Sequence, residues 1–413
     1  MSTSKLLCCR ACTAPLEHVF VDLGLSPLAN AYPRAEDLQK PEAFYPLTTY
    51  VCCQCWLVQL PAAASPETIF GDYAYFSSYS ESWLRHAADY VAMATDRFAL
   101  GPNHRVIEIA SNDGYLLRNF VARGIPALGV EPAKNVAAVA AAAGIPTRVA
   151  FFGEETARTL CADGLAADLV IANNVLAHTP ALNDFVRGLA LVLKPAGRAT
   201  LEFPHLLRLV EGNQFDTIYH EHFSYFSRGA GRAVFAAHGL AVFDVEELPS
   251  HGGSLRIFAQ RAGGAEAESA RVVDLLRRED AAGMRTRAYY AAFDEQVRET
   301  KRRLLEFLID AKRAGKRIAG YGAPAKGNTL LNYCGVRSDF VDYTVDASPH
   351  KQGLFLPGTR IPIHSPAHLR ANRPDYVWIL PWNLRNEIAT QMADIQDWGG
   401  KFVVAIPRVE IFP

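Results

Sequence analysis

The stretch Ile218–Phe226, "IYHEHFSYF", carries side chains that could do chemistry. His220, Glu221 and His222 stand in a row, and Tyr219 precedes them. These are the residue types that enzymes use to move protons. A solvated loop does not need so many aromatic residues, and a core strand does not accept three consecutive ionisable ones. The stretch is therefore a candidate acid/base site; the alternative is that its histidines are hydrogen-bonded residues that brace a loop.

Two pairs of cysteines have the spacing of a metal site. Cys9-x-x-Cys12 and Cys52-x-x-Cys55 are separated by 39 residues. Two thiolates three positions apart can turn onto one cation, and two such pairs complete the tetrahedral shell of structural zinc. Disulfides or buried thiols are the alternatives, and Cys8 competes with Cys9 for the first position. Because a four-thiolate shell is closed, we assign it no catalysis.

A strand, turn and helix follow in the segment "VIEIASNDGYLL". Glu108 lies near the end of this strand, and Glu131 ends the next one 23 residues later, the distance at which an acid can bind ribose hydroxyls. The turn lacks the G-x-G-x-x-G fingerprint, which disfavours NAD and favours a cofactor without phosphate, such as S-adenosylmethionine. Asn112, Asp113 and Gly114 would hold its amino-acid end and Glu131 its ribose. Alternatively, Glu108 is an acid at the core edge and Glu131 a helix cap.

Polar side chains also follow a later strand, in the segment "IANNVLAHTP". Asn173, Asn174 and His178 come where this strand ends. The carboxyl ends of parallel strands face the ligand crevice of an open sheet. We therefore expect Asn173 at the cofactor and Asn174 and His178 at the substrate, although His178 could instead cap a helix.

Near the C-terminus, "RIAGYGAPAKGNTLL" reads as a strand, a Gly-x-Gly turn and a helix. The N–H groups at such a helix start suit an anion, to which Lys326 adds charge and Asn328 a donor. Asp346 and Lys351 follow at the end of the next strand, where they could meet a nucleoside. Many Gly-x-Gly turns are only tight packing, which is the alternative. The missing third glycine argues against NAD.

Two α/β units are needed to position these residues. From Arg105 to about Gly263, strands alternate with helices, which predicts a parallel sheet with helices on both faces. Residues 264–315 predict one or two long linking helices, and a second alternation starts at Lys316. The expected fold class is therefore α/β, with three domains: residues 1–70, 71–263 and 264–413.

Composition narrows the classes of partner. The 413 residues include 42 basic and 43 acidic ones, so charge gives no reason to expect nucleic acid or an anionic membrane. There is no apolar run long enough for a transmembrane helix and no signal-peptide core at the N-terminus. We expect a cytoplasmic monomer with a small-molecule substrate, no nucleic acid and no membrane.

Taken in order, these motifs resemble the sugar C-methyltransferases, the family that contains tetronitrose C-3 methyltransferase. The cysteine pairs with "DLGLSPLANAY" resemble its zinc-binding lobe, "YFSSYS", "EIASNDGYLL", "GVEPAKN", "NNVLAH" and "YHEHFSYFS" its central domain, and "GYGAPAKGNTLLNYCG" its C-terminal domain. The resemblance implies a class I S-adenosylmethionine methyltransferase domain between the zinc-binding lobe and a second Rossmann-like domain. It also implies methyl transfer to C-3 of a nucleotide-linked 4-keto-deoxysugar, with S-adenosylmethionine as cofactor and zinc as a structural ion.

The implied reaction assigns roles to the acid/base cluster. A ketone at C-4 lets a base remove the C-3 proton, and the resulting enolate carbon attacks the sulfonium methyl group. The resemblance makes His222 and Tyr219 the catalytic pair. The chemistry lets His222 take the proton, and Tyr219 either donate to the enolate oxygen or serve as an alternative acid/base. Glu221 or His220 would orient His222 or contact sugar hydroxyls. Because Tyr219 and His222 are three residues apart, we predict a loop or helical turn that brings them together.

The substrate's other contacts follow from the same resemblance. We expect Lys326 and Asn328 to bind the pyrophosphate of a nucleotide sugar. Tyr75 belongs to an aromatic and serine patch that would close over the adenosine or the sugar, or else pack between domains.

Two other functions compete with this one. A nicotinamide-dependent nucleotide-sugar oxidoreductase would use the C-terminal unit, but the glycine fingerprint is incomplete. A zinc-dependent, non-catalytic binding module would not need the intact Y-H-E-H cluster, and the neutral charge speaks against nucleic acid.

Overall fold

The computed structural model describes residues 7–65, 69, 78 and 81–413. The chain forms two compact units, each built from segments that are separated in the sequence. Unit 1 comprises the described residues of segments 1–17, 52–205 and 223–285, and unit 2 those of segments 18–51, 206–222 and 286–413. Among these residues, no helix is both long and apolar enough to cross a membrane.

Unit 1 is built on a seven-stranded sheet. Its strands are β4 (Val106–Ile109), β5 (Ala127–Glu131), β6 (Thr147–Val149), β7 (Ala167–Asn173), β8 (Leu193–Pro204), β10 (Leu240–Leu248) and β11 (Ser254–Arg261). They lie in the order β10-β11-β8-β7-β4-β5-β6. The pairs from β8 to β6 are parallel, and β11 is antiparallel to both of its neighbours. The carboxyl ends of the five parallel strands therefore lie along one edge.

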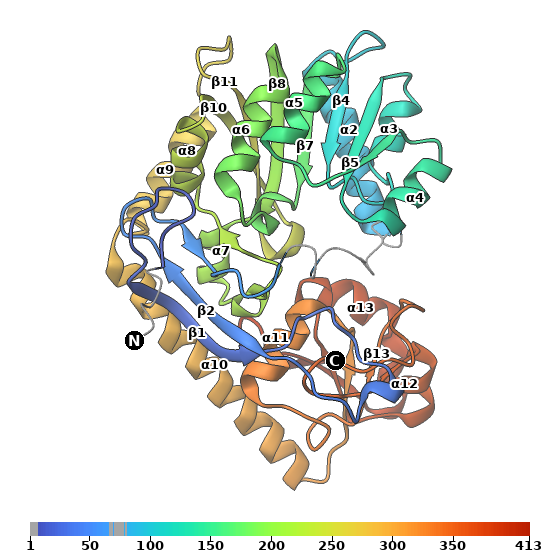
Figure 1. Ribbon diagram of the computed structural model, residues 1–413. Helices are drawn as coiled ribbons and strands as arrows, with labels where there is room; N and C mark the ends of the chain where they lie inside the picture. The colour runs from blue at the N-terminus through green and yellow to red at the C-terminus, as the bar shows by residue number, and fades with distance from the viewer. Residues whose placement is uncertain (1–6, 66–68, 70–77, 79–80) are drawn as a thin grey trace. The chain divides into compact units, whose positions relative to one another are not determined.

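Helices cover both faces of this sheet. In chain order they are α2 (Glu81–Arg97), α3 (Leu117–Val121), α4 (Lys134–Ala142), α5 (Glu154–Ala162), α6 (Leu182–Val192), α8 (Arg228–Ala236) and α9 (Ala270–Ala281). Figure 1 shows α5 and α6 in front of the sheet and α2 behind it. Tyr90 of α2 and Phe120 of α3 pack against Val106 and Leu169 in one apolar cluster. The nearly continuous apolar runs of β4 and β7 are typical of strands that are buried on both faces.

Shorter elements complete unit 1. β3 (Val58–Gln59) pairs antiparallel with β9 (Ser224–Tyr225), and two 3₁₀ turns, η3 (Leu176–His178) and η5 (Ser250–Gly252), follow β7 and β10. The N–H of Phe223 donates to Ala177 O of η3 over 2.7 Å.

Unit 2 contains a second Rossmann-like sheet. Its strands are β12 (Ile318–Tyr321), β13 (Thr344–Val345), β14 (Ile363–His364), β15 (Tyr376–Ile379), β16 (Lys401–Val404) and β17 (Glu410–Phe412), in the order β14-β13-β12-β15-β16-β17. All pairs are parallel except β16 with β17. The helical elements of this unit are η1 (Ala35–Asp37), α7 (Leu206–Glu211), η4 (Phe215–Thr217), α10 (Arg287–Arg313), α11 (Ala325–Cys334), α12 (Pro366–Asn372), η6 (Trp382–Leu384), α13 (Arg385–Gln391) and η7 (Ala393–Trp398).

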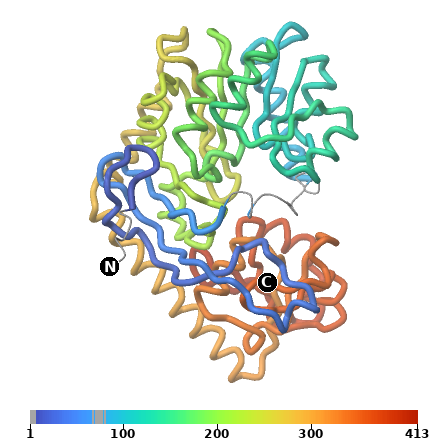
Figure 2. The backbone as a smooth tube through the Cα atoms, in the orientation of Figure 1, coloured from blue at the N-terminus to red at the C-terminus, as the bar shows by residue number. Residues whose placement is uncertain are grey.

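An antiparallel hairpin from the start of the chain belongs to unit 2. It consists of β1 (His18–Ser26) and β2 (Tyr45–Val51). Figure 2 shows the blue hairpin running along the yellow-orange α10, although more than 200 residues separate them in the sequence. Phe20 of β1 stacks on Phe293 of α10 with ring centroids 4.6 Å apart, which fixes the hairpin by burial of aromatic surface.

The fold class predicted from the sequence is confirmed. Both sheets are α/β and mostly parallel. Of the one or two long helices expected between residues 264 and 315, two are present, α9 and α10, and they belong to different units.

Candidate active site and zinc site

The two cysteine pairs of unit 1 converge on one point. The Sγ atoms of Cys9, Cys12, Cys52 and Cys55 all lie within 4.8 Å of one another. The Sγ atoms of Cys9 and Cys55 are 3.6 Å apart, and those of Cys12 and Cys52 are 3.5 Å apart. Four thiolates in a tetrahedron around zinc have sulfur–sulfur distances of about 3.8 Å, which is close to these values. The donor set and its size therefore fit a zinc ion.

The structure also decides the register of the first pair. Cys9 is buried and belongs to the cluster, whereas Cys8 is exposed and does not. The side-chain amide of Gln59 donates to the sulfur of Cys9 over 3.1 Å, and the N–H of Gln54 donates to the sulfur of Cys52 over 3.4 Å. Such contacts from outside the ligand shell stabilise thiolates and hold their orientation.

The turn after β4 has the shape of a ligand loop. Ala110, Asn112 and Gly114 all adopt positive φ, at 53°, 52° and 78°. The N–H of Asn112 donates to Glu131 Oε2 over 2.9 Å, and the N–H of Ala133 donates to Glu131 Oε1 over 2.8 Å. Glu131, at the end of β5, therefore fastens this turn and also caps the start of α4, as the helix-cap alternative anticipated.

Carboxylates gather around this turn. Burial raises the pKa of Glu108 well above its usual value, and the charges of Glu131 and Asp113 raise it further. Burial likewise raises the pKa of Glu131, against the two N–H groups that it accepts from. Glu108 Oε2 is buried and has no hydrogen-bond partner among the described residues. Acceptors that lack donors suit a ligand that brings cationic groups and hydroxyls, and S-adenosylmethionine has an ammonium, a sulfonium and ribose hydroxyls.

The residues after β7 lie on the same edge of the sheet. Asn173 is the last residue of β7, and its Oδ1 is buried without a hydrogen-bond partner within the described part of the chain. Asn174 has a φ of 55°, and its side-chain nitrogen lies 3.5 Å from Nε2 of His251. His178 ends the η3 turn and is half-buried. These three residues thus share one edge with Glu131.

One group on this edge was missed from the sequence. Glu202, in β8, pairs in register with Asn173 and is fully buried. Burial opposes its ionisation, but hydrogen bonds from His86 at 2.9 Å, Ser250 at 2.8 Å and Arg256 at 3.0 Å hold the pKa of Glu202 below its usual range. The signal in the sequence was an acid inside the apolar strand "TLEFP".

The acid/base cluster forms a tight turn in unit 2. The N–H of His222 donates to Tyr219 O over 2.9 Å, and the two rings lie 4.1 Å apart between centroids. The predicted turn is confirmed. His222 Nδ1 lies 2.7 Å from Thr217 O, and because a carbonyl oxygen only accepts, Nδ1 carries the proton. In the neutral ring, Nε2 is then the basic nitrogen.

The two residues between Tyr219 and His222 face different partners. Glu221 is buried and accepts from Asn30 Nδ2 at 2.5 Å. Burial raises the pKa of Glu221 to about 7, while Asn30 and the charge of Lys351 hold it down. His220 Nε2 lies 3.2 Å from Pro46 O, so this histidine braces the turn against β2. Burial lowers the pKa of His220 and favours its neutral form.

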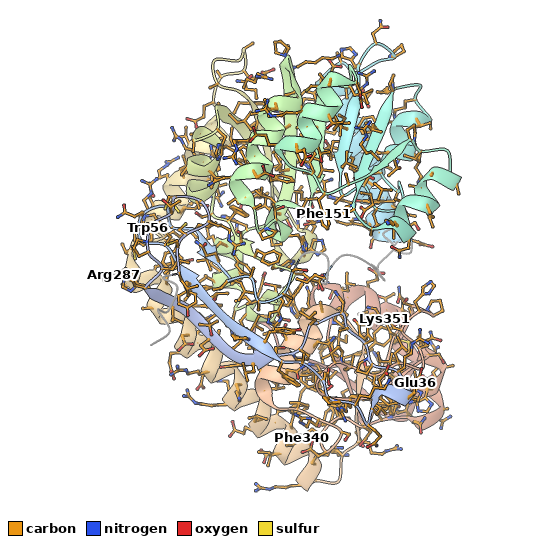
Figure 3. All side chains as sticks on the ribbon, viewed as in Figure 1. Glu36, Trp56, Phe151, Arg287, Phe340 and Lys351 are labelled. Atoms are coloured by element: carbon orange, nitrogen blue, oxygen red, sulfur yellow. The ribbon has the colours of Figure 1, made fainter. Side chains whose placement is uncertain are left out.

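The Gly-x-Gly turn of unit 2 repeats the device seen at Glu131. Asp346, which follows β13, accepts the N–H of Ala323 through Oδ2 at 2.7 Å. Lys351, labelled in Figure 3, lies 3.9 Å from the same carboxylate and donates to Ala323 O over 2.8 Å. Gly322 has a φ of 90°, and a Cβ there would lie 2.6 Å from Pro381, so tight packing accounts for this glycine.

Two residues of α11 that were expected to contact substrate have partners within unit 2. Lys326 donates to Asn383 Oδ1 over 2.7 Å; burial lowers its pKa, and the charge of Asp216 opposes this. Asn328 is buried and donates to Ala29 O over 2.6 Å. Lys326 therefore lies beside the turn. The side-chain NH2 group of Asn328 holds the segment that contains Ala29, whereas its Oδ1 is buried without a hydrogen-bond partner among the described residues. Tyr75 lies outside the described residues.

Comparisons with known proteins decide the family. The C-methyltransferase NovU of Streptomyces niveus is 35% identical over 403 residues, which cover 98% of this chain and 96% of NovU. This chain belongs to the C-methyltransferase family. Three family models match it: "Putative zinc binding domain" over residues 9–70, "Methyltransferase domain" over residues 83–245, and "C-methyltransferase C-terminal domain" over residues 249–407.

Some solved structures are similar to part of this chain. An S-adenosylmethionine dependent methyltransferase from Mesorhizobium loti is 16% identical, with a TM-score of 0.34, and the match covers 43% of this chain and 100% of that one. Magnesium protoporphyrin IX methyltransferase of Synechocystis PCC 6803 is 15% identical at a TM-score of 0.34, covering 43% and 83%. These scores are too low to add to the assignment.

This member of the C-methyltransferase family is thus an S-adenosylmethionine-dependent enzyme with a zinc-binding domain, in which Cys9, Cys12, Cys52 and Cys55 lie close enough together to hold a structural zinc ion. The recognition made from the sequence is confirmed at this level. The competing interpretations, a nicotinamide enzyme and a non-catalytic zinc module, are not supported by the family.

Proposed function

We propose that this C-methyltransferase transfers a methyl group to C-3 of a nucleotide-linked 4-keto-deoxysugar through an enolate. The observation that carries the proposal is the turn from Thr217 to His222. Its hydrogen bond from His222 Nδ1 to Thr217 O, 2.7 Å long, fixes the tautomer in which Nε2 can accept a proton. Such a fixed, largely buried imidazole suits a general base that works near neutral pH.

In the proposed reaction, bonds change on the substrate and the cofactor, and the protein's own part is to move one proton, the one on C-3. His222 Nε2 takes the proton from C-3, and the electron pair that is left spreads onto the C-4 oxygen. The hydroxyl of Tyr219 donates to that oxygen as its charge develops. When bound, S-adenosylmethionine would supply an electrophilic methyl group: as C-3 bonds to the methyl carbon, the bond from that carbon to sulfur would break and its electron pair would stay on sulfur in S-adenosylhomocysteine. The imidazolium keeps its Nδ1 bond to Thr217 O and returns its proton to water after product leaves.

We assign the remaining site residues by the unit that holds them. In unit 1, the cofactor-binding set is Glu108, Asn112, Asp113, Gly114, Glu131 and Asn173. Substrate contacts come from Asn174 and His178 in unit 1, from His220 and Lys326 in unit 2, and from Tyr75. Glu221 acts as an acceptor that orients the acid/base turn. Asn328 of α11 is proposed as a substrate contact beside Lys326.

We also propose a role for each domain, a type of partner and a cellular compartment. By function, residues 1–70 carry zinc, residues 71–263 the cofactor and residues 264–413 the nucleotide, with the hairpin segment 18–51 and the acid/base segment 206–222 belonging to unit 2. The partner is a small nucleotide sugar, and the enzyme works as a monomer. A reducing compartment such as the cytoplasm keeps the four thiols available to zinc.

Exchange of the C-3 hydrogen with solvent tests the base directly. The enzyme is incubated in deuterated water with a thymidine-linked 4-keto-6-deoxysugar, and exchange is followed by mass spectrometry. We expect exchange with the native enzyme and a loss of about 100-fold or more in His222→Ala, because general-base catalysis contributes on that scale. Guanosine- and cytidine-linked sugars tested beside it identify the nucleotide.

The matched control is His368→Ala. His368 is a half-buried histidine of α12 in the same unit, and it stacks on His364 rather than on the acid/base turn. Exchange should be unchanged in this variant. Equal exchange in native enzyme and His222→Ala would remove His222 as the base.

A further inference from the structure

A chain of polar contacts runs through unit 2 from the Gly-x-Gly turn to Glu221. At one end, the hydroxyl of Tyr32 donates to Ala323 O over 2.6 Å. The same hydroxyl lies 3.3 Å from Asn30 Oδ1, and Asn30 Nδ2 donates to Glu221 Oε1 over 2.5 Å. Asn30 and Tyr32 thus lie between the turn that accepts an anion and the turn that holds the base.

We propose that Asn30 and Tyr32 are positioning residues. They connect the Ala323 turn to Glu221 and hold the Glu221 carboxylate in place. Through Glu221 they position the Tyr219–His222 turn. The inference rests on the proposed function of that turn. Neither residue touches the reacting atoms in this role. They act by holding a carboxylate in one orientation and in its ionised form.

The position of Asn30 is fixed from a second direction. Asn328 of α11 donates to Ala29 O over 2.6 Å, and this donor is fully buried. Thr329, the next residue of α11, donates to Ile218 O over 3.0 Å. One helix therefore holds both the segment that carries Asn30 and the segment that carries Tyr219.

Glu221 depends on Asn30 because little else offsets its burial. Its side chain is 5% exposed, and a buried carboxylate without a donor takes up a proton instead. Lys351 supplies the nearest opposite charge, from the loop after β13. A protonated Glu221 would lose the acceptor that orients the turn.

The groups that face this carboxylate come from several elements. From the hairpin segment they are Asn30 and the phenol of Tyr32; from the loop after β13, Lys351, with Asp346 behind it. The two histidines of its own turn are directed to other partners, His220 to Pro46 O and His222 to Thr217 O. Of these, burial favours the neutral form of His220, as its lowered pKa indicates.

The ring of Tyr32 adds a link to the charged loop. Lys351 Nζ lies 5.3 Å from the centre of that ring and shares Ala323 O with the Tyr32 hydroxyl. A diphosphate that draws Lys351 away from Ala323 would change the two contacts that hold Tyr32. Substrate binding is thereby coupled to the ionisation of Glu221.

The test compares Asn30→Asp and Tyr32→Phe with the native enzyme in the C-3 exchange assay across pH 5–9. In Asn30→Asp, two carboxyl groups share one site, so Glu221 binds a proton more tightly and the acid limb of the profile should move up by about one pH unit or more. In Tyr32→Phe, the rate should fall about three- to tenfold with the KM for substrate unchanged, which is the loss expected for one hydrogen bond.

Structural damage is separated by a matched variant, Asn332→Ala. Asn332 donates to Asn328 O and to Pro357 O in the same unit and does not reach Glu221. It should lower the unfolding temperature without moving the acid limb. An unshifted limb in Asn30→Asp, together with an unchanged rate in Tyr32→Phe, would overturn the inference.

The same assay separates this inference from the proposed function. If the native enzyme exchanges the C-3 hydrogen and His222→Ala does not, the proposed function stands. The Asn30 and Tyr32 variants alone then decide whether these two residues position Glu221. If His222→Ala exchanges like the native enzyme, the proposed function falls whatever these variants do.

Discussion

The two units use the same device at the two turns to which we assign opposite kinds of ligand in the proposed function. In unit 1, Glu131 at the end of β5 accepts the N–H of Asn112 from the turn after β4. In unit 2, Asp346 after β13 accepts the N–H of Ala323 from the turn after β12. In both, an acid at the end of the second strand fastens the loop that leads from the first strand to its helix.

The surroundings of the two acids differ. Glu131 lies near Glu108 and Asp113. The charges of Glu131 and Asp113 raise the pKa of Glu108. Asp346 lies 3.9 Å from Lys351. A cluster of carboxylates suits a cationic cofactor, whereas a lysine beside a turn of N–H groups suits a phosphate. The comparison teaches that one backbone arrangement acquires its ligand class from a few neighbouring charges.

The largest effect should come from the acid of unit 1. Glu131→Gln removes a charge that would accept from the ribose and weakens both N–H contacts that fasten the turn. We expect affinity for S-adenosylmethionine to fall about 100-fold, the loss of one or two hydrogen bonds to a charged group. Calorimetric titration measures it, with Glu155→Gln on the exposed face of α5 as the control. Affinity for thymidine diphosphate should not change; a loss there would break the comparison.

The lysine of unit 2 should give the converse result with a smaller loss. In Lys351→Gln, the dissociation constant for thymidine diphosphate should rise about tenfold because one charge-assisted contact is lost. Affinity for S-adenosylmethionine should stay as it is. Lys316→Gln, which removes a lysine paired with Asp375 on the surface of the same unit, is the control. Equal losses of both ligands in Lys351→Gln would contradict the separate assignment.

The smallest effect concerns stability of the enzyme without ligand. Burial and its acidic neighbours raise the pKa of Glu108 from 4.5, so the folded state holds this proton more tightly than the unfolded state does. Its contribution therefore destabilises the fold progressively as pH rises from about 4.5 through the raised value. Glu108→Gln should remove that part of the pH dependence.

Calorimetry checks this sign. At neutral pH, Glu108→Gln should raise the unfolding temperature by about 1 °C, the change expected for roughly 1 kcal/mol in a protein of this size. At pH 4 the two proteins should unfold at nearly the same temperature. If the variant is less stable than the native protein at every pH, the Glu108 carboxylate stabilises the folded state. That result would contradict the comparison of charges around the two turns.

Short-range patterns in the sequence predicted the local parts of both sites. The spacing of Cys9 and Cys12 predicted a metal site, and three positions between Tyr219 and His222 predicted a turn, because in each case the partners lie on the same few residues of backbone. The alternation of strands and helices predicted two α/β sheets for the same reason.

Contacts between distant segments could not be predicted in this way. The sequence predicted Asn328 as a ligand donor at a helix start, but it gave no sign that the side-chain NH2 group donates to Ala29 O, 299 residues away. His220 is likewise held by Pro46 O, 174 residues away. Asn30 gave no sign of its role, because its partner is fixed only when the hairpin segment joins unit 2. Two signals of long-range contacts did stand in the sequence: the second cysteine pair, 39 residues after the first, and an acid in an apolar strand, as at Glu202.

The comparison between the two turns is tested most directly by hydrogen–deuterium exchange of the intact enzyme with one ligand at a time. S-adenosylhomocysteine should protect the backbone amides of residues 110–114 and 131–133, and thymidine diphosphate those of residues 322–327 and 346–351. Each ligand should leave the other turn unprotected. Protection of the same turn by both ligands, or an exchange of the two patterns, would contradict the account.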